Sequence, residues 1–233
     1  MGQGERRKVP EEDDSFTRWI EACAAGELLG IASAALWWVT CDRFDPAPVG
    51  LTAEILMLVA KGGSGLIQGL VLGFLQGWAL RRPYPTISAS HWTLATTVIA
   101  LGGWSFAAWI SVFGWEGTPE APVLNLMQTA LTAGVFGVVT GLLFGSAQAL
   151  VLRGVAHRSY WWIGANAIGW GLALPCIYIA SSVGSAQPGS LEIAFRGLVG
   201  GVASGVVLGA VTGLSFSLMS ARYPAPAPAG PRF

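Results

Sequence analysis

The side chain best suited to chemistry in this sequence is the acid Glu27. It lies eight residues after the tryptophan that opens the first long apolar stretch, or about 12 Å along a helix and well inside a bilayer. A carboxylate at that depth is costly unless it is protonated, paired or hydrated. Lys61 is the nominal counter-ion, but we expect it near the opposite interface. We therefore expect Glu27 to be neutral, or bonded to Gln76, Gln148 or Asn166; a proton-carrying role and a packing role both stay open.

Further polar side chains recur in sets of three within the apolar stretches. Gln76, Gln148 and Thr212 each lie three residues after a glycine, about one turn from the basic end of their stretch. One interpretation is hydrogen bonding between helices, worth on the order of 0.6 kcal/mol each. The other is a polar ring around a central cavity.

Two more sets occupy equivalent positions. Gln68, Thr140 and Ser204 fall near the middle of their stretches. Because hydroxyl groups can bond to carbonyls of their own helix, only Gln68 requires a partner on another helix. Cys23, Thr96 and Asn166 each follow a tryptophan by four residues. Asn166 is the most polar of these, and we expect it at a contact between neighbouring repeats.

Recognisable catalytic and metal-binding motifs are missing from the sequence. We find no phosphate-binding loop, zinc-protease helix, nucleophile elbow or dinucleotide fingerprint. The three cysteines lack zinc-type spacing and a disulfide framework. His91 and His157 could ligate a haem or a chlorin, but we expect both to be solvated loop residues. We predict no catalytic residue, no metal and no fixed cofactor, although a bound lipid or pigment stays open.

Glycine recurs every fourth residue in three stretches that resemble one another. The positions are Gly65, Gly69, Gly73; Gly137, Gly141, Gly145; and Gly201, Gly205, Gly209. The second set follows the first by 72 residues and the third follows the second by 64. Such glycines form a flat stripe on one face of a helix. Since no hydrophobic force drives helices together in lipid, we expect each stripe, or glycine ladder, to pack closely against another helix.

Composition places these elements in a membrane. Apolar residues make up 53% of the 233 residues and charged residues 11%, against about a quarter in soluble domains. The charges concentrate in the first 18 residues and between long apolar runs. Thirteen basic and thirteen acidic residues cancel, so no net field attracts nucleic acid. We predict an all-α membrane protein with six transmembrane helices.

The predicted helices form three pairs with a polar tail at each end. The expected parts are the tail 1–17, the repeats 18–82, 91–158 and 160–222, and the Pro/Ala-rich tail 223–233. In the first repeat, the stretch 51–81 exceeds the thickness of the hydrocarbon layer. We therefore expect 61–80 to span the bilayer and 51–60 to lie along the interface. Because each unit has two spans, the three copies insert in parallel around a pseudo-threefold axis.

The sidedness follows from loop charge. The 81–91 and 153–159 loops and the C-terminal tail are basic, whereas the 42–50, 116–122 and 183–192 loops are neutral to acidic. The positive-inside rule then places both termini in the cytoplasm. Tryptophans are expected as interfacial anchors. The inner belt would hold Trp19, Trp78, Trp92, Trp161 and Trp162, and the outer belt Trp37, Trp38, Trp109 and Trp115.

The chain resembles a family of bacterial integral membrane proteins found notably in cyanobacteria, a family for which we know of no established activity. The resemblance rests on the tryptophan-led Ala/Gly helices and on G-x-x-Q-x-x-x-L-R, as at Gly73 to Arg81 and Gly145 to Arg153. The third copy departs, with Thr212 for glutamine and Ser217 for arginine. The resemblance implies a bacterial inner membrane, cytoplasmic or photosynthetic.

These features predict a non-enzymatic membrane subunit or scaffold. It would pack against lipid, other membrane protein subunits or pigments, and not against nucleic acid. The alternative is a pore or small-solute carrier with a central polar path. An intramembrane enzyme has the least support. The first two differ in what the centre of the bundle contains: side chains and lipid, or a continuous polar path.

Overall fold

The computed structural model describes residues 14–114, 124–185 and 188–222. They form six helices: α1 (Ser15–Phe44), α2 (Leu51–Leu80), α3 (Ala89–Phe113), α4 (Leu126–Leu152), α5 (Trp161–Ser182) and α6 (Ser190–Leu214), followed by a short 3-10 helix η1 (Ser215–Leu218). All six are long and apolar enough to cross a membrane. The predicted all-α class and six spans are confirmed. Residues 1–13 of the predicted N-terminal tail, all of the predicted tail 223–233, the predicted 116–122 loop and Trp115 of the expected outer belt lie outside the described residues.

One helix differs from expectation. Leu51–Ala60 does not lie apart along the interface, because α2 runs unbroken from Leu51 to Leu80. No proline interrupts this leucine-rich segment, and Gly50, at φ +90°, supplies the turn before it. A second boundary differs as well: the apolar pattern predicts that the last helix begins at about Arg196, but α6 begins at Ser190, so Arg196 lies within the helix.

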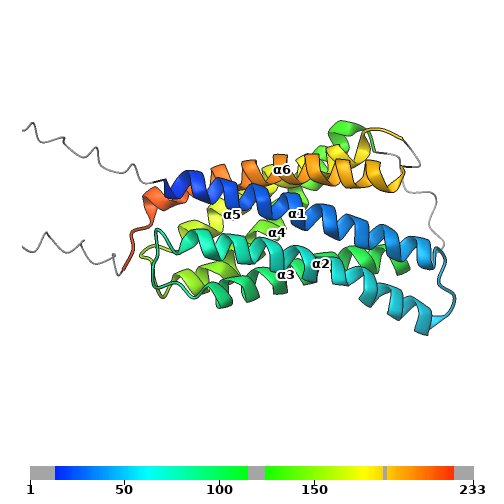
Figure 1. The fold of residues 1–233 in the computed structure, drawn as a ribbon, viewed down its shortest axis with the longest axis horizontal. Coiled ribbons are helices and arrows are strands. Elements are labelled where there is room, and N and C mark those ends of the chain that lie inside the picture. Colours follow the sequence, from blue (N-terminus) through cyan, green and yellow to red (C-terminus); the bar gives the residue numbers. More distant parts are fainter. Residues whose placement is uncertain (1–13, 115–123, 186–187, 223–233) are drawn as a thin grey trace, which may run out of the picture.

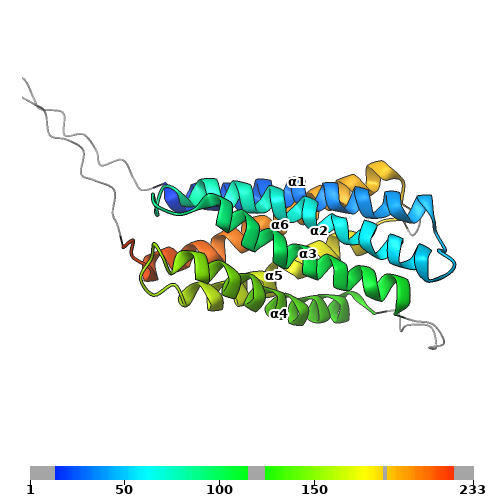
Figure 2. The same cartoon turned by 90° about the horizontal axis from the view of Figure 1, so that it is seen from below.

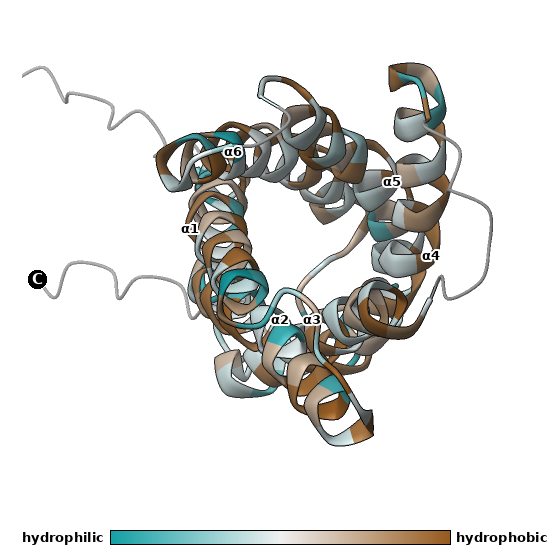
Figure 3. Cartoon of the chain, turned by 90° about the vertical axis from the view of Figure 1, so that its right-hand side faces the viewer, coloured by the Kyte–Doolittle hydropathy of each residue, from teal (hydrophilic) through white to brown (hydrophobic). Residues whose placement is uncertain are grey.

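The helices run side by side in an elongated bundle (Figures 1 and 2). Seen along its length, they form a ring (Figure 3). The tight neighbours are α2 with α3, α4 with α5, and α6 with α1. The helices α3 and α4 make few contacts with each other. Both described chain ends lie at one end of the bundle, here called the Trp end; the opposite end, with the α1–α2 and α5–α6 connections, is the far end.

The glycine ladders form the three tight contacts. The ladder of α2 faces α3, that of α4 faces α5, and that of α6 faces α1. A Cβ atom at Gly65 would lie 2.5 Å from the Ala100 carbonyl oxygen, and one at Gly205 would lie 2.5 Å from the Cys23 carbonyl oxygen. At all nine ladder positions the nearest atom belongs to the backbone of the facing helix. Each ladder thus contacts a helix outside its own predicted pair.

Short polar segments close the Trp end. The amide of His157 donates to the carbonyl of Ser220 at 2.8 Å, and the amide of Arg222 donates to the carbonyl of Val155 at 2.8 Å. The hydroxyl of Tyr84 donates to the Met219 carbonyl at 3.3 Å. Burial raises the pKa of Tyr84 to about 12, so this donor stays protonated at moderately alkaline pH as well as at neutral pH. The C-terminal segment is therefore held against both loops at this end.

Candidate functional site

Three tryptophans meet on the bundle axis near the Trp end. Trp19, Trp92 and Trp162, from α1, α3 and α5, pack edge to face with ring centroids 5.4–6.2 Å apart. All three are buried, so their predicted place in an interfacial belt is wrong. Trp161, in contrast, is 45% exposed on the outer surface. The three buried rings form what we call the Trp cluster.

Polar side chains of the ladder helices accept hydrogen bonds from the indole N–H groups of the Trp cluster. Trp92 donates to Gln76 Oε1 at 3.3 Å, and Trp162 donates to Gln148 Oε1 at 2.9 Å. Trp19 donates to Thr212 Oγ1 at 2.8 Å. A buried indole N–H usually finds such a partner, which explains why these rings lie inside rather than at the interface. The sequence shows one tryptophan and one polar side chain per repeat, but not the hydrogen bond that joins them.

The glutamines also bond to the third set of polar residues. Gln76 Nε2 donates to Cys23 Sγ at 3.4 Å, and Gln148 Nε2 donates to Thr96 Oγ1 at 2.9 Å. Asn166 instead donates to the Trp162 carbonyl of its own helix at 3.0 Å, and its backbone faces Gly141. Of the two interpretations of Gln76, Gln148 and Thr212, the geometry agrees with bonding between helices.

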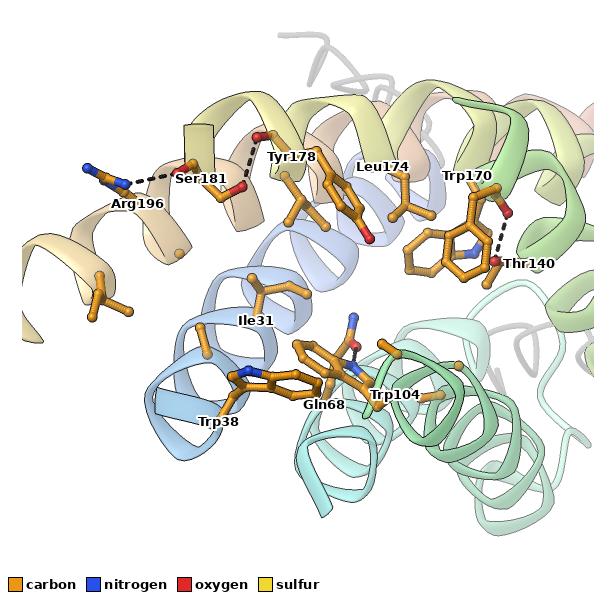
Figure 4. A pocket seen from close by; sticks show the side chains of 18 of the residues that line it. Ile31, Trp38, Gln68, Trp104, Thr140, Trp170, Leu174, Tyr178, Ser181 and Arg196 are labelled. Atoms are coloured by element: carbon orange, nitrogen blue, oxygen red, sulfur yellow. Dashed lines mark hydrogen bonds between the residues drawn. The ribbon is translucent and has the colours of Figure 1, made fainter. Parts of the chain in front are cut away.

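A cavity of about 520 Å³ lies between the Trp cluster and the far end (Figure 4). Residues from all six helices line it, and most of them are apolar. Its aromatic lining comprises Trp38, Trp104, Phe136, Phe144, Trp170 and Tyr178. Along α2, Gln68 lines the cavity, Leu72 joins an apolar layer with Phe144 and Leu208, and Gln76 contacts the Trp cluster. Two buried layers thus separate the cavity from the Trp end.

One polar chain runs from the cavity wall to Glu27. Trp104 Nε1 donates to Gln68 Oε1 at 2.6 Å (Figure 4), and Gln68 Nε2 donates to Glu27 Oε2 at 2.9 Å. Glu27 is fully buried, and its Oε1 has no hydrogen-bond partner among the described residues. The predicted bond from Glu27 to Gln76, Gln148 or Asn166 is therefore wrong. Gln68 has the partner on another helix that its chemistry required.

The hydroxyl residues equivalent to Gln68 bond within their own helices, as expected. Thr140 donates to the Phe136 carbonyl at 2.8 Å, and Ser204 donates to the Gly201 carbonyl at 3.0 Å. Because these hydroxyls are satisfied locally, the polar chain to Glu27 has no counterpart at either residue.

The buried Lys61 has partners of its own. Its ammonium group lies 2.6 Å from Asp42 and donates to Ser111 at 2.9 Å, above the ring of Trp38. Lys61 is therefore paired with Asp42 and does not act as a counter-ion for Glu27.

Arg196 lines the cavity near the far end and is held in place by its own helix, by the end of α5 and by the α5–α6 connection. It forms an ion pair with Glu192 at 2.5 Å and donates to the carbonyls of Ser181 at 2.9 Å and Ser185 at 2.8 Å. The lining of the cavity therefore presents no unpaired charge. Arg196 is not evident as a lining residue from the sequence, because the apolar pattern places it at the start of a helix, whereas it lies about one and a half turns inside α6.

Comparison with protein-family models, with curated proteins and with solved structures finds no match for this chain. Within residues 14–114, 124–185 and 188–222, no group of three or more His, Cys, Asp or Glu side chains could hold a metal ion. The features that bear on function are therefore the cavity, the Trp cluster and the polar chain to Glu27.

Proposed function

We propose that the protein is a non-enzymatic integral membrane protein that holds one uncharged, lipid-soluble molecule in its central cavity. The observation that carries this proposal is the cavity itself. Its volume of about 520 Å³ lies within the range of small-molecule sites, which are mostly apolar with a few placed polar groups. Aromatic side chains line it, together with Arg196, whose charge is balanced by Glu192. A lipid or a pigment matches that lining.

The proposed architecture has three equivalent helix pairs around a pseudo-threefold axis. Its support is the repeated contact of a glycine ladder with the odd-numbered helix of the next pair, α6 closing onto α1. The three indole bonds to Gln76, Gln148 and Thr212 repeat in the same order. Alternating loop charge supports cytoplasmic termini in a bacterial inner membrane, as does the family resemblance. Reporter fusions after Arg82 and after Glu116 should then report opposite compartments.

A subunit or scaffold role belongs to the same proposal. All nine ladder glycines face helices of this chain, so another membrane protein would contact the apolar outer surface instead. Native-gel pull-down from source membranes tests this role: a defined complex supports it, and a lone monomer argues against it.

A small-solute carrier is the second candidate. The polar chain from Trp104 through Gln68 to Glu27 favours it, because an acid inside the membrane can bind a proton or a cation. Against it, the Leu72 layer and the Trp cluster interrupt any polar path toward the Trp end. Parallel copies also differ from the inverted repeats of many carriers. An intramembrane enzyme has no observation in its favour.

Two adjacent glycines of α3 allow a test of whether the cavity is the binding site. Gly103 lines the cavity, Gly102 is exposed on the outer surface, and a Cβ atom at either would meet nothing within 4 Å. Gly103→Leu should therefore fill part of the cavity without distorting the helices, and Gly102→Leu is its matched control. Native mass spectrometry should show a bound small molecule on the wild type and on Gly102→Leu, but not on Gly103→Leu. Equal occupancy in all three would remove the cavity as the binding site.

A further inference from the structure

We propose that the molecule in the cavity is a quinone, a flat uncharged ring that carries carbonyl acceptors. This inference rests on the proposed function, since it names the class of molecule that the cavity holds. Three properties of the lining carry it: the arrangement of its aromatic rings, two hydrogen-bond donors without partners, and the absence of a free charge.

Aromatic rings stand on two sides of the cavity (Figure 4). On one side, Trp170 stacks on Phe144 with centroids 4.9 Å apart and planes 13° apart. On the other, Trp38 and Trp104 lie 5.7 Å apart, centroid to centroid. Stacked and edge-to-face contacts favour a planar ring over a flexible saturated chain. The lining therefore indicates a flat ligand.

Two donors on α5 are unused. Trp170 is only 4% exposed, yet no described residue accepts a bond from its indole N–H. The hydroxyl of Tyr178 points into the cavity and also lacks a partner among the described residues. The buried indoles of Trp19, Trp92 and Trp162, in contrast, are all satisfied. Trp170 lines the cavity and Tyr178 is 41% exposed, so both donors are accessible to acceptor oxygens of a molecule bound there.

The remaining polar lining excludes other ligand classes. The charge of Arg196 is balanced by Glu192 and only its Nε–H lacks a partner, so a phosphate or a fatty acid would bring an unbalanced negative charge into the described lining. The Gln68 carbonyl already accepts from Trp104. An uncharged ring whose carbonyl oxygens accept from Trp170 and Tyr178 satisfies both donors and adds no buried charge. Its apolar tail would lie where α3 and α4 make few contacts with each other.

The test uses the full chain in lipid nanodiscs, with decylubiquinone as the probe and decylbenzene as a competitor that has the same tail but no carbonyl. Binding is followed by quenching of tryptophan fluorescence, against empty nanodiscs. Trp170→Phe and Tyr178→Phe each remove one donor and keep an aromatic ring, which is smaller than the indole at position 170. Trp161→Phe and Tyr160→Phe are the matched controls, since both residues are exposed at the start of the same helix.

Each donor variant should weaken decylubiquinone binding roughly fivefold to tenfold, the effect of one hydrogen bond, and leave competition by decylbenzene weak. The controls should bind like the wild type. If both donor variants bind decylubiquinone as tightly as the wild type, the quinone inference is wrong. If decylbenzene then competes fully and Gly103→Leu abolishes binding of both probes, the quinone inference fails but the proposed function stands, because the cavity still holds an apolar molecule. Absence of binding of either probe to the wild type would overturn both proposals.

Discussion

Replacing the middle glycine of a ladder with alanine tests how tightly the helices pack. A Cβ atom at Gly69 would lie 2.5 Å from the Thr97 Cα, and one at Gly205 would lie 2.5 Å from the Cys23 carbonyl oxygen. At Gly141 it would contact the carbonyl oxygen of Asn166. Because backbone atoms cannot rotate away as a side chain can, the two helices must separate. We expect each substitution to destabilise the protein.

The expected loss in the free energy of unfolding follows from a comparison of the ladder variants with Gly164→Ala. A Cβ atom at Gly164 meets nothing within 4 Å, so that variant gains only the helix propensity of alanine, about 1 kcal/mol. The same gain applies at Gly69, Gly141 and Gly205 and cancels in the comparison. The difference is then the cost of overpacking, about 1–3 kcal/mol. If the three interfaces are equivalent, the three ladder variants should agree within about 1 kcal/mol, an allowance for the usual spread between sites.

The assay is reversible unfolding in mixed micelles, with the free energy of unfolding taken from the loss of helical signal. Gly164→Leu and Gly141→Leu extend the comparison to a large side chain, for which the yield of folded protein is the readout. Ladder variants as stable as Gly164→Ala would refute the close backbone packing. A loss at one ladder alone would refute the equivalence of the three interfaces.

Two further predictions concern the buried polar groups. Trp162→Phe should lower the free energy of unfolding by about 1–3 kcal/mol, because Gln148 Oε1 loses its donor inside the bundle, whereas Trp161→Phe should change it little; equal effects of the two would show that the indole bond is unimportant. Glu27→Gln should leave stability and ligand binding nearly unchanged, because an amide oxygen still accepts from Gln68; a carboxylic-acid infrared band that titrates near neutral pH, and that this variant lacks, would instead favour a carrier.

The sequence was sufficient to predict the six helices, since their length and apolar composition decide them. The glycine spacing also predicted that some helix must approach closely. The glycine spacing did not identify which helix each ladder contacts, because connections of similar length allow a ladder to face either of the two helices next to it. The observed partner lies in the neighbouring pair, as for Gly65 against Ala100.

The Trp cluster could not be predicted from individual residues. An indole at the end of an apolar stretch fits an interfacial belt as well as a buried cluster. The distinction lies in whether an acceptor is within reach, as Gln148 is for Trp162 and Thr212 is for Trp19. One tryptophan and one acceptor per repeat was the available signal. The bond between Glu27 and Gln68 follows the same logic, since both residues lie in the middle of neighbouring helices.

The central claim is that the cavity holds an uncharged, lipid-soluble molecule. It is tested most directly by a cryo-electron microscopy map of the protein purified from its own membranes, with a bound antibody fragment to aid alignment. We predict non-protein density for one flat molecule between Trp104 and Trp170, in contact with the Tyr178 hydroxyl. A cavity filled by water, or closed by movement of the surrounding side chains, would contradict the account.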